Sequence, residues 1–190
     1  LCGNALQAFQ DAAFQVGSVI TTTGYATVDF DKWPQLSRTI MVLLMFIGAC
    51  AGSTGGGIKV SRVLILLKSV KKELKQYLHP SAVEKIKMDG KIVEHEVVRS
   101  TNVFMVAYVL IFAVSVLLIS LDEYDLVTNF TVVTATFNNI GPGLALVGPT
   151  GNFGFFSNFS KLVLIFDMLA GRLEIFPLLL LFSRETWKRF

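Results

Sequence analysis

Thr21-Thr22-Thr23-Gly24-Tyr25 is a short polar run that stands between a short apolar segment and a long one. A weaker version, Asn138-Asn139-Ile140-Gly141-Pro142-Gly143, occupies the same context about 117 residues later. Irregular backbone is tolerated at membrane depth only where it is buried in protein or lines a water-filled path. Carbonyl and hydroxyl oxygens in such a backbone can replace the hydration shell of a monovalent cation. The two runs therefore favour ion permeation over catalysis, and we expect neither an enzyme nor a bound cofactor.

The composition is that of a membrane protein. Hydrophobic residues make up 53% of the 190 residues and charged residues only 16%, with a mean hydropathy of +0.59. Soluble domains are considerably more polar than this. We therefore expect the chain to be surrounded by lipid.

Charged residues are distributed unevenly. Ten of the 17 Lys and Arg residues lie between Lys59 and Arg99, and none lies between Asp122 and Ser160. Because positive charge gathers on cytoplasmic loops, we expect residues 59–99 and the C-terminus in the cytoplasm. These basic residues flank apolar spans, so a nucleic-acid partner is not expected. Five acidic residues lie on the opposite side of the membrane: Asp29, Asp31, Asp122, Glu123 and Asp125. They could concentrate cations at a pore entrance, but ordinary solvated loop charge is the simpler explanation.

Three long apolar segments are candidates for membrane spans. Ser100 to Leu121 offers 22 consecutive uncharged positions, and about 20 residues suffice to cross a bilayer. Thr39 to Ile58 is also uncharged, but glycines in its second half predict a break in the helix. Leu162 to Ser183 is the third segment and carries three ionisable residues.

Two further segments are too short or too polar to span. Asn4 to Ile20 contains Gln and Asp residues, and Leu126 to Phe137 has only 12 residues, a length expected of a re-entrant helix. Each runs straight into one of the two polar runs. The order predicts an all-α membrane protein, built from span–pore-loop–span repeats with re-entrant pore helices, as in a K⁺ channel.

An internal repeat supports this order. Arg38-x6-Met45-x2-Gly48 matches Lys161-x6-Met168-x2-Gly171 in spacing and in its Leu/Ile-rich filling. Both units enter the membrane in the same orientation, which indicates parallel repeats around a pore axis. The first unit lacks a leading span.

The stretch between the two units is basic and amphipathic. Lys68, Lys71, Lys72 and Lys75 recur at helical spacing within Val63 to Lys75 and so share one face. Such a face usually lies beside anionic lipid head groups. Met88-Asp89-Gly90-Lys91 predicts a hairpin turn between the short runs Val83–Ile86 and Ile92–Val93. This hairpin is either a surface for a partner or a simple connector.

Four blocks of the chain resemble the Trk/Ktr/HKT potassium transporter superfamily. They resemble, in order, its third pore loop, its Gly-rich intramembrane loop, its fourth pore loop and the last span of the TrkH-type branch. The blocks are Ser18 to Tyr25, Met45 to Lys59, Asn138 to Gly143 with Val147 to Phe153, and Ala170 to Phe176. They cover nearly the whole chain.

The resemblance implies a C-terminal fragment of a four-repeat potassium uptake protein. Residues 1–75 correspond to a third repeat without its first span, 76–98 to a cytoplasmic linker, and 99–190 to the fourth repeat. The family further implies a homodimer in the cell inner membrane and a cytosolic TrkA-type nucleotide-binding subunit. The pseudo-fourfold pore would be incomplete here, because a filter needs four loops.

The candidate selectivity filter consists of the two polar runs. Gly24 can adopt backbone angles closed to other residues, which allows neighbouring carbonyls to turn toward one axis, and Gly141 matches it in the second run. The filter residues are Thr21, Thr22, Thr23, Gly24, Asn138, Asn139, Ile140 and Gly141, with K⁺ expected at Thr22, Thr23, Asn139 and Ile140. An ordinary polar loop between helices is the alternative.

The candidate gate lies below the filter. By resemblance, Gly52, Ser53, Thr54, Gly55, Gly56 and Gly57 form a movable loop, and a static break for close helix packing is the alternative. Arg172 is an ionisable residue inside a span, which is usually functional. On a helix it lies about 140° from Asp167 and about 160° from Glu174, so neither can pair with it. Arg172 would add a positive barrier to the pore, unless it forms an ion pair with another helix.

Two alternatives to this function remain. One is a Na⁺-coupled transporter subunit of the Ktr branch, against which the Gly171 to Phe176 block and Asn138-Asn139 argue. The other is a non-conducting membrane scaffold that has kept the pore-loop fold.

Overall fold

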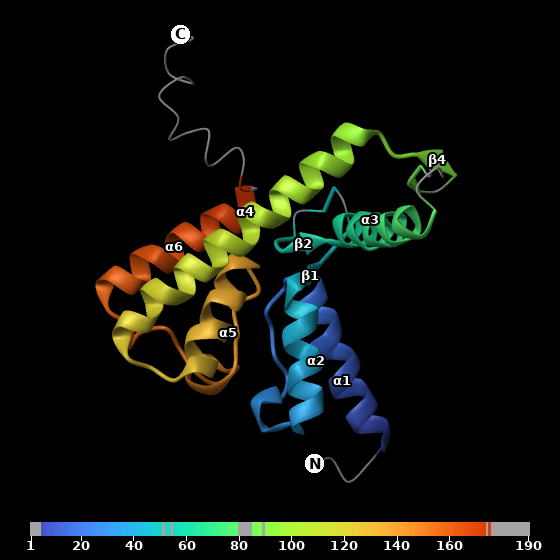
Figure 1. Cartoon of the computed structure of the whole chain (residues 1–190). Helices are drawn as coiled ribbons and strands as arrows, with labels where there is room; N and C mark the ends of the chain where they lie inside the picture. The colour runs from blue at the N-terminus through green and yellow to red at the C-terminus, as the bar shows by residue number, and fades with distance from the viewer. Residues whose placement is uncertain are drawn as a thin grey trace.

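The computed structural model describes residues 5–50, 52–53, 55–79, 85–88, 90–173 and 175. Six α-helices dominate this part of the chain (Figure 1): α1 Ala5–Ile20, α2 Gln35–Phe46, α3 Val60–Leu78, α4 His95–Ile119, α5 Leu126–Phe137 and α6 Asn158–Leu173. Short 3-10 helices occupy Phe30–Lys32, Ser120–Asp122 and Ala145–Val147. Apart from two minimal strand pairs described below, the regular secondary structure of the described residues is helical, as expected.

Helix α4 is the candidate membrane span among the described residues. With the 3-10 helix that follows it, it forms a segment from His95 to Asp122, 28 residues long, which is long and apolar enough to cross a membrane. Its length and composition agree with the span predicted at Ser100 to Leu121. Helices α2 and α5 are apolar but shorter.

Helix α5 is the buried centre of the second half. Its bounds, Leu126–Phe137, are those predicted for the re-entrant helix, and it packs against α2, α4 and α6. Asp125 caps its N-terminus, where the carboxylate accepts hydrogen bonds from the hydroxyl and backbone N–H of Thr128. These hydrogen bonds lower the pKa of Asp125, so the cap is charged at neutral pH. The hydroxyls of the other buried threonines of α5, Thr131, Thr134 and Thr136, donate to carbonyls of the same helix.

Helices α1 and α2 run side by side in the same direction (Figure 1) and dock on the second half. Val19 of α1 and Met41 and Met45 of α2 share an apolar cluster with Ile140 and Leu144, which follow α5 in the chain. This cluster positions the end of α1 beside the end of α5, although the two lie more than a hundred residues apart.

The break after α2 begins earlier than the glycine count suggested. The expected span Thr39 to Ile58 starts as helix at Gln35 but ends at Phe46, ahead of the first glycine. The strands β1 Ile47–Gly48 and β2 Ile58–Lys59 then pair in parallel and close a loop between them. A Cβ on Gly48 would lie 2.2 Å from the carbonyl oxygen of Gly56, so the close approach of the two strands requires glycine.

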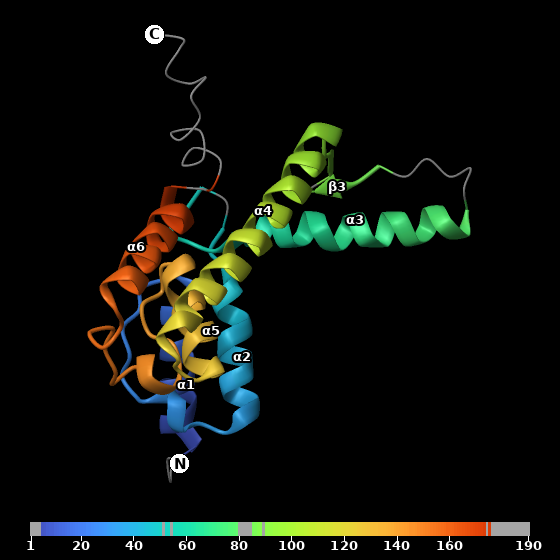
Figure 2. The ribbon, with the colours of Figure 1, turned by 60° about the vertical axis from the view of Figure 1, so that its left-hand side comes forward.

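Helix α3 leaves this loop crosswise to α2 (Figures 1 and 2). The structure contains the predicted hairpin after α3. Its strands are β3 Lys87–Met88 and β4 Lys91–Ile92, which lie closer to the turn than the predicted runs Val83–Ile86 and Ile92–Val93. A hydrogen bond of 2.8 Å from Val93 N to Ile86 O continues the pairing.

Helix α6 returns along α4 and α5 (Figure 1). It begins four residues before the predicted span of Leu162 to Ser183 and is described to Leu173. The remainder of that predicted span, including Glu174, lies outside the described residues apart from Ile175.

Candidate functional site

The chain ends both α1 and α5 with the same backbone motif. In each case two successive N–H groups bond back to carbonyls three and five residues earlier, which is the Schellman pattern of a helix C-terminus. In the first turn, residues 21–24, Thr22 N bonds Val19 O (3.1 Å) and Thr23 N bonds Ser18 O (2.9 Å). In the second turn, residues 138–141, Asn139 N bonds Thr136 O (3.0 Å) and Ile140 N bonds Ala135 O (2.8 Å). The repeat seen in the sequence thus extends to the backbone of the two runs.

The backbone angles of the two turns also correspond. Thr22 and Asn139 are left-handed, with φ of 54° and 55°, and Gly24 and Gly141 have φ of 80° and 109°. Asn is a common left-handed residue, whereas a β-branched residue such as Thr is an outlier there. The conformation at Thr22 is therefore imposed by its surroundings.

The two turns are in direct contact. A Cβ on Gly24 would lie 2.1 Å from the carbonyl oxygen of Ile140, so only glycine allows the turns to approach this closely. The Thr21 hydroxyl bonds the carbonyl of Gly17 and lies 2.7 Å from the Thr23 hydroxyl.

The two turns line one cavity of about 660 Å³. The four residues expected to coordinate K⁺, Thr22, Thr23, Asn139 and Ile140, all lie in its wall. Gly141 also lines it, as do Lys161 and Met168 of α6. The turns carry backbone carbonyls and the Thr22 and Thr23 hydroxyls, which are ligand types for hard monovalent cations. Much of the remaining wall is apolar, with Phe153, Leu164 and Ile165 among its residues.

The side chain of Asn138 lies away from this cavity. Asn138 is fully buried, its Oδ1 accepts a hydrogen bond of 2.7 Å from Tyr108 of α4, and its Nδ2 donates to the carbonyl of Thr134. Tyr108 was not among the predicted site residues. A tyrosine hydroxyl within a predicted span needs a partner, and this was the one signal that could have indicated its role.

Helix α6 holds the second turn from the side. The Asn139 Nδ2 donates to the carbonyl of Met168 at 3.0 Å. A Cβ on Gly171 would lie 1.8 Å from the carbonyl oxygen of Phe137. Gly171, which the sequence marks only as a repeated glycine, is therefore the point of closest packing between α6 and the end of α5.

The Gly-rich loop touches both turns. A Cβ on Gly55 would lie 3.3 Å from the Thr22 hydroxyl oxygen, and a Cβ on Gly56 would lie 2.4 Å from the Asn138 carbonyl oxygen. Gly57, with φ of 76°, lies against the Asn138 side chain. Gly52 has φ of 86° and open space around it, and Thr54 lies outside the described residues.

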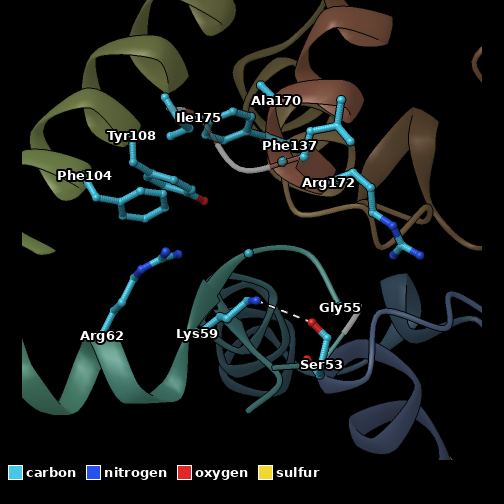
Figure 3. Close-up of a pocket in the computed structure, with 13 residues that line it drawn as sticks. Ser53, Gly55, Lys59, Arg62, Phe104, Tyr108, Phe137, Ala170, Arg172 and Ile175 are labelled. Carbon is cyan, nitrogen blue, oxygen red and sulfur yellow. Dashed lines mark hydrogen bonds between the residues drawn. The ribbon is translucent and has the colours of Figure 1, made fainter. Parts of the chain in front are cut away.

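A second cavity, of about 230 Å³, lies beside this loop (Figure 3). Ser53, Gly55 and Gly57 of the loop line it together with Lys59, Arg62 and Arg172. Lys59 Nζ donates to the Ser53 carbonyl at 3.4 Å, and Arg62 lies 4.0 Å from the ring centre of Phe104. No acidic residue is among the described residues that line the cavity, so it is an electropositive site.

Arg172 projects from the end of α6, away from Arg62 and the aromatic rings (Figure 3). It is exposed and forms no ion pair with an acidic side chain in the described part of the chain. Asp167 is fully buried and accepts a hydrogen bond of 2.7 Å from Ser115 of α4. This agrees with the expectation that Asp167 does not pair with Arg172.

Asp31 forms specific contacts and is not simply a solvated loop charge. Its Oδ1 lies 3.1 Å from the Arg38 guanidinium and accepts a hydrogen bond from Ala145 N at 3.1 Å. The carboxylate thus joins the loop after the first turn to the loop after the second. No periodicity in the sequence could have indicated this contact.

Comparison with known proteins gives a consistent result. The family model described as "TrkH: Cation transport protein" matches residues 4–189. Trk system potassium uptake protein TrkH of Salmonella typhimurium is 42% identical over 185 residues, which are 97% of this chain and 38% of that protein. TrkH of Vibrio parahaemolyticus is 43% identical over 181 residues, 95% of this chain and 37% of that protein. The chain therefore spans somewhat more than a third of the length of these curated relatives.

A solved structure shows the same fold. The crystal structure of the potassium transporter TrkH from Vibrio parahaemolyticus superposes with a TM-score of 0.88 at 42% identity, covering 98% of this chain and 39% of that one. The mostly helical transporter fold and the apolar span α4 mark a membrane protein. On the strength of these matches over nearly its whole length, this chain belongs to the TrkH family of cation transport proteins.

Proposed function

We propose that this chain is part of a potassium uptake protein and that its two turns form part of the ion path. The observation that carries this proposal is the pair of equivalent Schellman turns that line one cavity. The relatives are named as potassium uptake proteins, and none of the features described requires a catalytic step. K⁺ enters this proposal as the transported ion.

In this proposal the turns act as two loops of a selectivity filter. Oxygens of Thr22, Thr23, Asn139 and Ile140 face K⁺, while the flanking residues Thr21, Gly24, Asn138 and Gly141 hold the backbone. Helices α1 and α5 serve as re-entrant pore helices, each followed by its turn and a return helix. Because the chain spans about 38% of its relatives, a longer polypeptide supplies the remaining loops of a pseudo-fourfold pore.

The Gly-rich loop and Arg172 form the gate in this proposal. Support comes from the contacts of Gly55 and Gly56 with the two turns, since a loop that touches both can open or close the path beneath them. Residues 52–57, Thr54 among them, would move as a unit. Arg172 adds positive charge to the same region and so opposes cation passage.

The wider assembly follows the family. We propose an inner-membrane protein that pairs as a homodimer and binds a cytosolic TrkA-type nucleotide-binding subunit, with residues 59–99 and the C-terminus in the cytoplasm. The division into residues 1–75, 76–98 and 99–190 belongs to the same proposal.

Rescue of a bacterium that lacks K⁺ uptake tests the function. The longest reading frame that includes this chain should restore growth at low K⁺, and the 190-residue chain alone serves as the negative control. Repeating the assay without Na⁺ separates this function from a Na⁺-coupled Ktr-type transporter. Normal membrane insertion without any Rb⁺ uptake would favour a non-conducting scaffold.

Gly24 offers a sharper test with a matched control. Gly24 and Gly90 have nearly the same φ, 80° and 78°, but a Cβ on Gly90 meets nothing within 4 Å. Gly24→Ala should abolish Rb⁺ uptake or alter the preference for K⁺ over Na⁺, because the added methyl group displaces the Ile140 carbonyl. Gly90→Ala carries the same backbone strain and should transport normally. Unchanged uptake and unchanged preference in Gly24→Ala would refute the filter assignment.

A further inference from the structure

A groove rich in lysine lies between α3 and the β3–β4 hairpin. Its volume is about 640 Å³. Six lysines make up most of its wall: Lys68, Lys71, Lys72 and Lys75 of α3, and Lys85 and Lys87 of the hairpin segment. The remaining lining residues are Ile86 and Ile92. We call this the lysine groove. No acidic side chain is among the described residues that line it.

The groove is built by the fold and not by helical spacing alone. The Lys68 ammonium group donates a hydrogen bond of 2.6 Å to the carbonyl of Lys87, which fastens the hairpin to α3. Two segments separated by the α3–hairpin connection thus bring their lysines to one concave surface. Within the described residues, Lys71, Lys72 and Lys85 form no ion pair with an acidic side chain. Like charges held this close repel each other and produce a strongly positive local potential.

The position of the groove indicates which anion it meets. A neighbouring cavity shares Lys72, Lys85, Ile86 and Ile92 with the groove. The rest of its wall consists of Glu73, Val93, Glu94 and the start of α4, including Arg99 and Asn102. The uncharged run of α4 begins at Ser100, so we infer that the groove lies near the level where this candidate span would leave the bilayer. Helix α3 runs crosswise to α2 at this level (Figure 2). Phosphate groups of lipid heads occupy this depth.

We propose that the lysine groove binds the phosphate groups of anionic phospholipids. Basic clusters beside a membrane span attract anionic lipid, and lysine binds phosphate as a mobile point charge. Ile86 and Ile92 supply apolar surface for the glycerol and upper acyl carbons of the same lipid. The groove shares no residue with the two turns or the Gly-rich loop, so this inference stands apart from the proposed ion path.

Binding of short-chain lipids to the detergent-purified longer protein tests the proposal. Dioctanoyl phosphatidylglycerol is titrated against dioctanoyl phosphatidylcholine, and inorganic phosphate serves as the free-anion probe. The groove variant is Lys71→Gln/Lys87→Gln, which leaves the Lys68 hydrogen bond intact. The matched control is Lys32→Gln/Lys91→Gln, which removes the same charge, including one lysine of the hairpin that does not line the groove.

The wild-type protein should prefer phosphatidylglycerol. Since each lysine near an anionic surface contributes roughly fivefold in affinity, the groove variant should bind it roughly 25-fold more weakly. The control variant should bind like wild type, and both should keep the wild-type unfolding temperature.

Four results would overturn the proposal. Equal affinity of the wild type for both lipids removes the anionic preference, and equal weakening in both double variants reduces the effect to net charge. Inorganic phosphate binding as tightly as phosphatidylglycerol assigns the groove to a soluble anion. Loss of a cytosolic protein subunit from the groove variant, with lipid affinity unchanged, assigns it to an acidic protein surface.

Discussion

Thr22 occupies the left-handed position that ends α1, where Gly or Asn is the usual residue. A residue held in a sparsely populated backbone region costs on the order of 1–3 kcal/mol and persists only where its surroundings fix it. Here the surroundings are the Schellman hydrogen bonds and the approach of Gly55 to the Thr22 hydroxyl. Asn139 holds the same position in the second turn without that cost. The chain therefore keeps a strained threonine where an unstrained residue would fit, which is consistent with a role for its hydroxyl oxygen.

Exchanging the two residues separates strain from function. Thr22→Asn should raise the free energy of unfolding by about 1 kcal/mol, because Asn accepts the left-handed angles. Asn139→Thr should lower it by about 2 kcal/mol, because it adds the strain and removes the hydrogen bond to Met168 O. Thermal unfolding in detergent measures both shifts. Rb⁺ uptake should fall in Thr22→Asn despite its greater stability.

Two results for Thr22→Asn would contradict these expectations. A less stable Thr22→Asn would show that the threonine is not strained, and full uptake with unchanged K⁺ preference would show that its hydroxyl does not serve the ion.

At the scale of elements, the sequence predicted the helix bounds and turns that depend on residues close together in the chain. The bounds of α5 followed from the short apolar run between an acidic loop and the polar run, and in the structure Asp125 caps its N-terminus. The two turns followed from Gly24 and Gly141. The early end of α2 could not be predicted, because it goes with the parallel pairing of β1 and β2 and the close approach of Gly48 to Gly56, which no spacing in the sequence indicates.

The same limit applies to the candidate site. Four residues expected at the ion do line one cavity, because the repeat placed them at equivalent positions. The inward side chain of Asn138, bonded to Tyr108, and the Asp31 contact with Ala145 depend on how helices pack. Neither contact has a signature in the spacing of residues.

The contact between α5 and α6 can be tested at Gly171. Gly171→Ala places a methyl group against the Phe137 carbonyl, which must push α6 away from the second turn. We expect a lower unfolding temperature and loss of Rb⁺ uptake. Gly17→Ala in α1, where the added Cβ meets nothing within 4 Å, should instead be neutral or stabilise by about 0.5–1 kcal/mol. Equal behaviour of the two variants would mean that the close approach at Gly171 is not required.

At the scale of the whole molecule, the two halves are buried unequally. Helix α5 is enclosed by three helices and buries most of its residues, whereas α1 packs on α2 and leaves Leu6 and Phe9 more than two-thirds exposed. The two helices end in the same turn, so under the proposed function we expect further neighbours to cover α1 in the longer protein. A polypeptide the length of the relatives offers such neighbours. The open wall of the cavity between the turns has the same explanation.

Arg172 links this arrangement to the flux of the whole molecule. Its charge lies in the electropositive cavity beside the Gly-rich loop, below the proposed filter. Arg172→Gln should raise Rb⁺ flux about twofold or more, since one unit charge at about 10 Å in water changes a cation's energy by about 0.4 kcal/mol, and a less polar pore strengthens the effect. Arg172→Lys should transport like wild type, because the charge stays. Arg62→Gln is the matched control, since it removes a cation of the same cavity that packs on the Phe104 ring and lies apart from Arg172 (Figure 3). A fall in the Rb⁺ flux of Arg172→Gln at normal expression would instead identify a structural ion pair between Arg172 and the rest of the longer protein. Equal increases in flux in Arg172→Gln and Arg62→Gln would show that only the summed charge of the cavity matters.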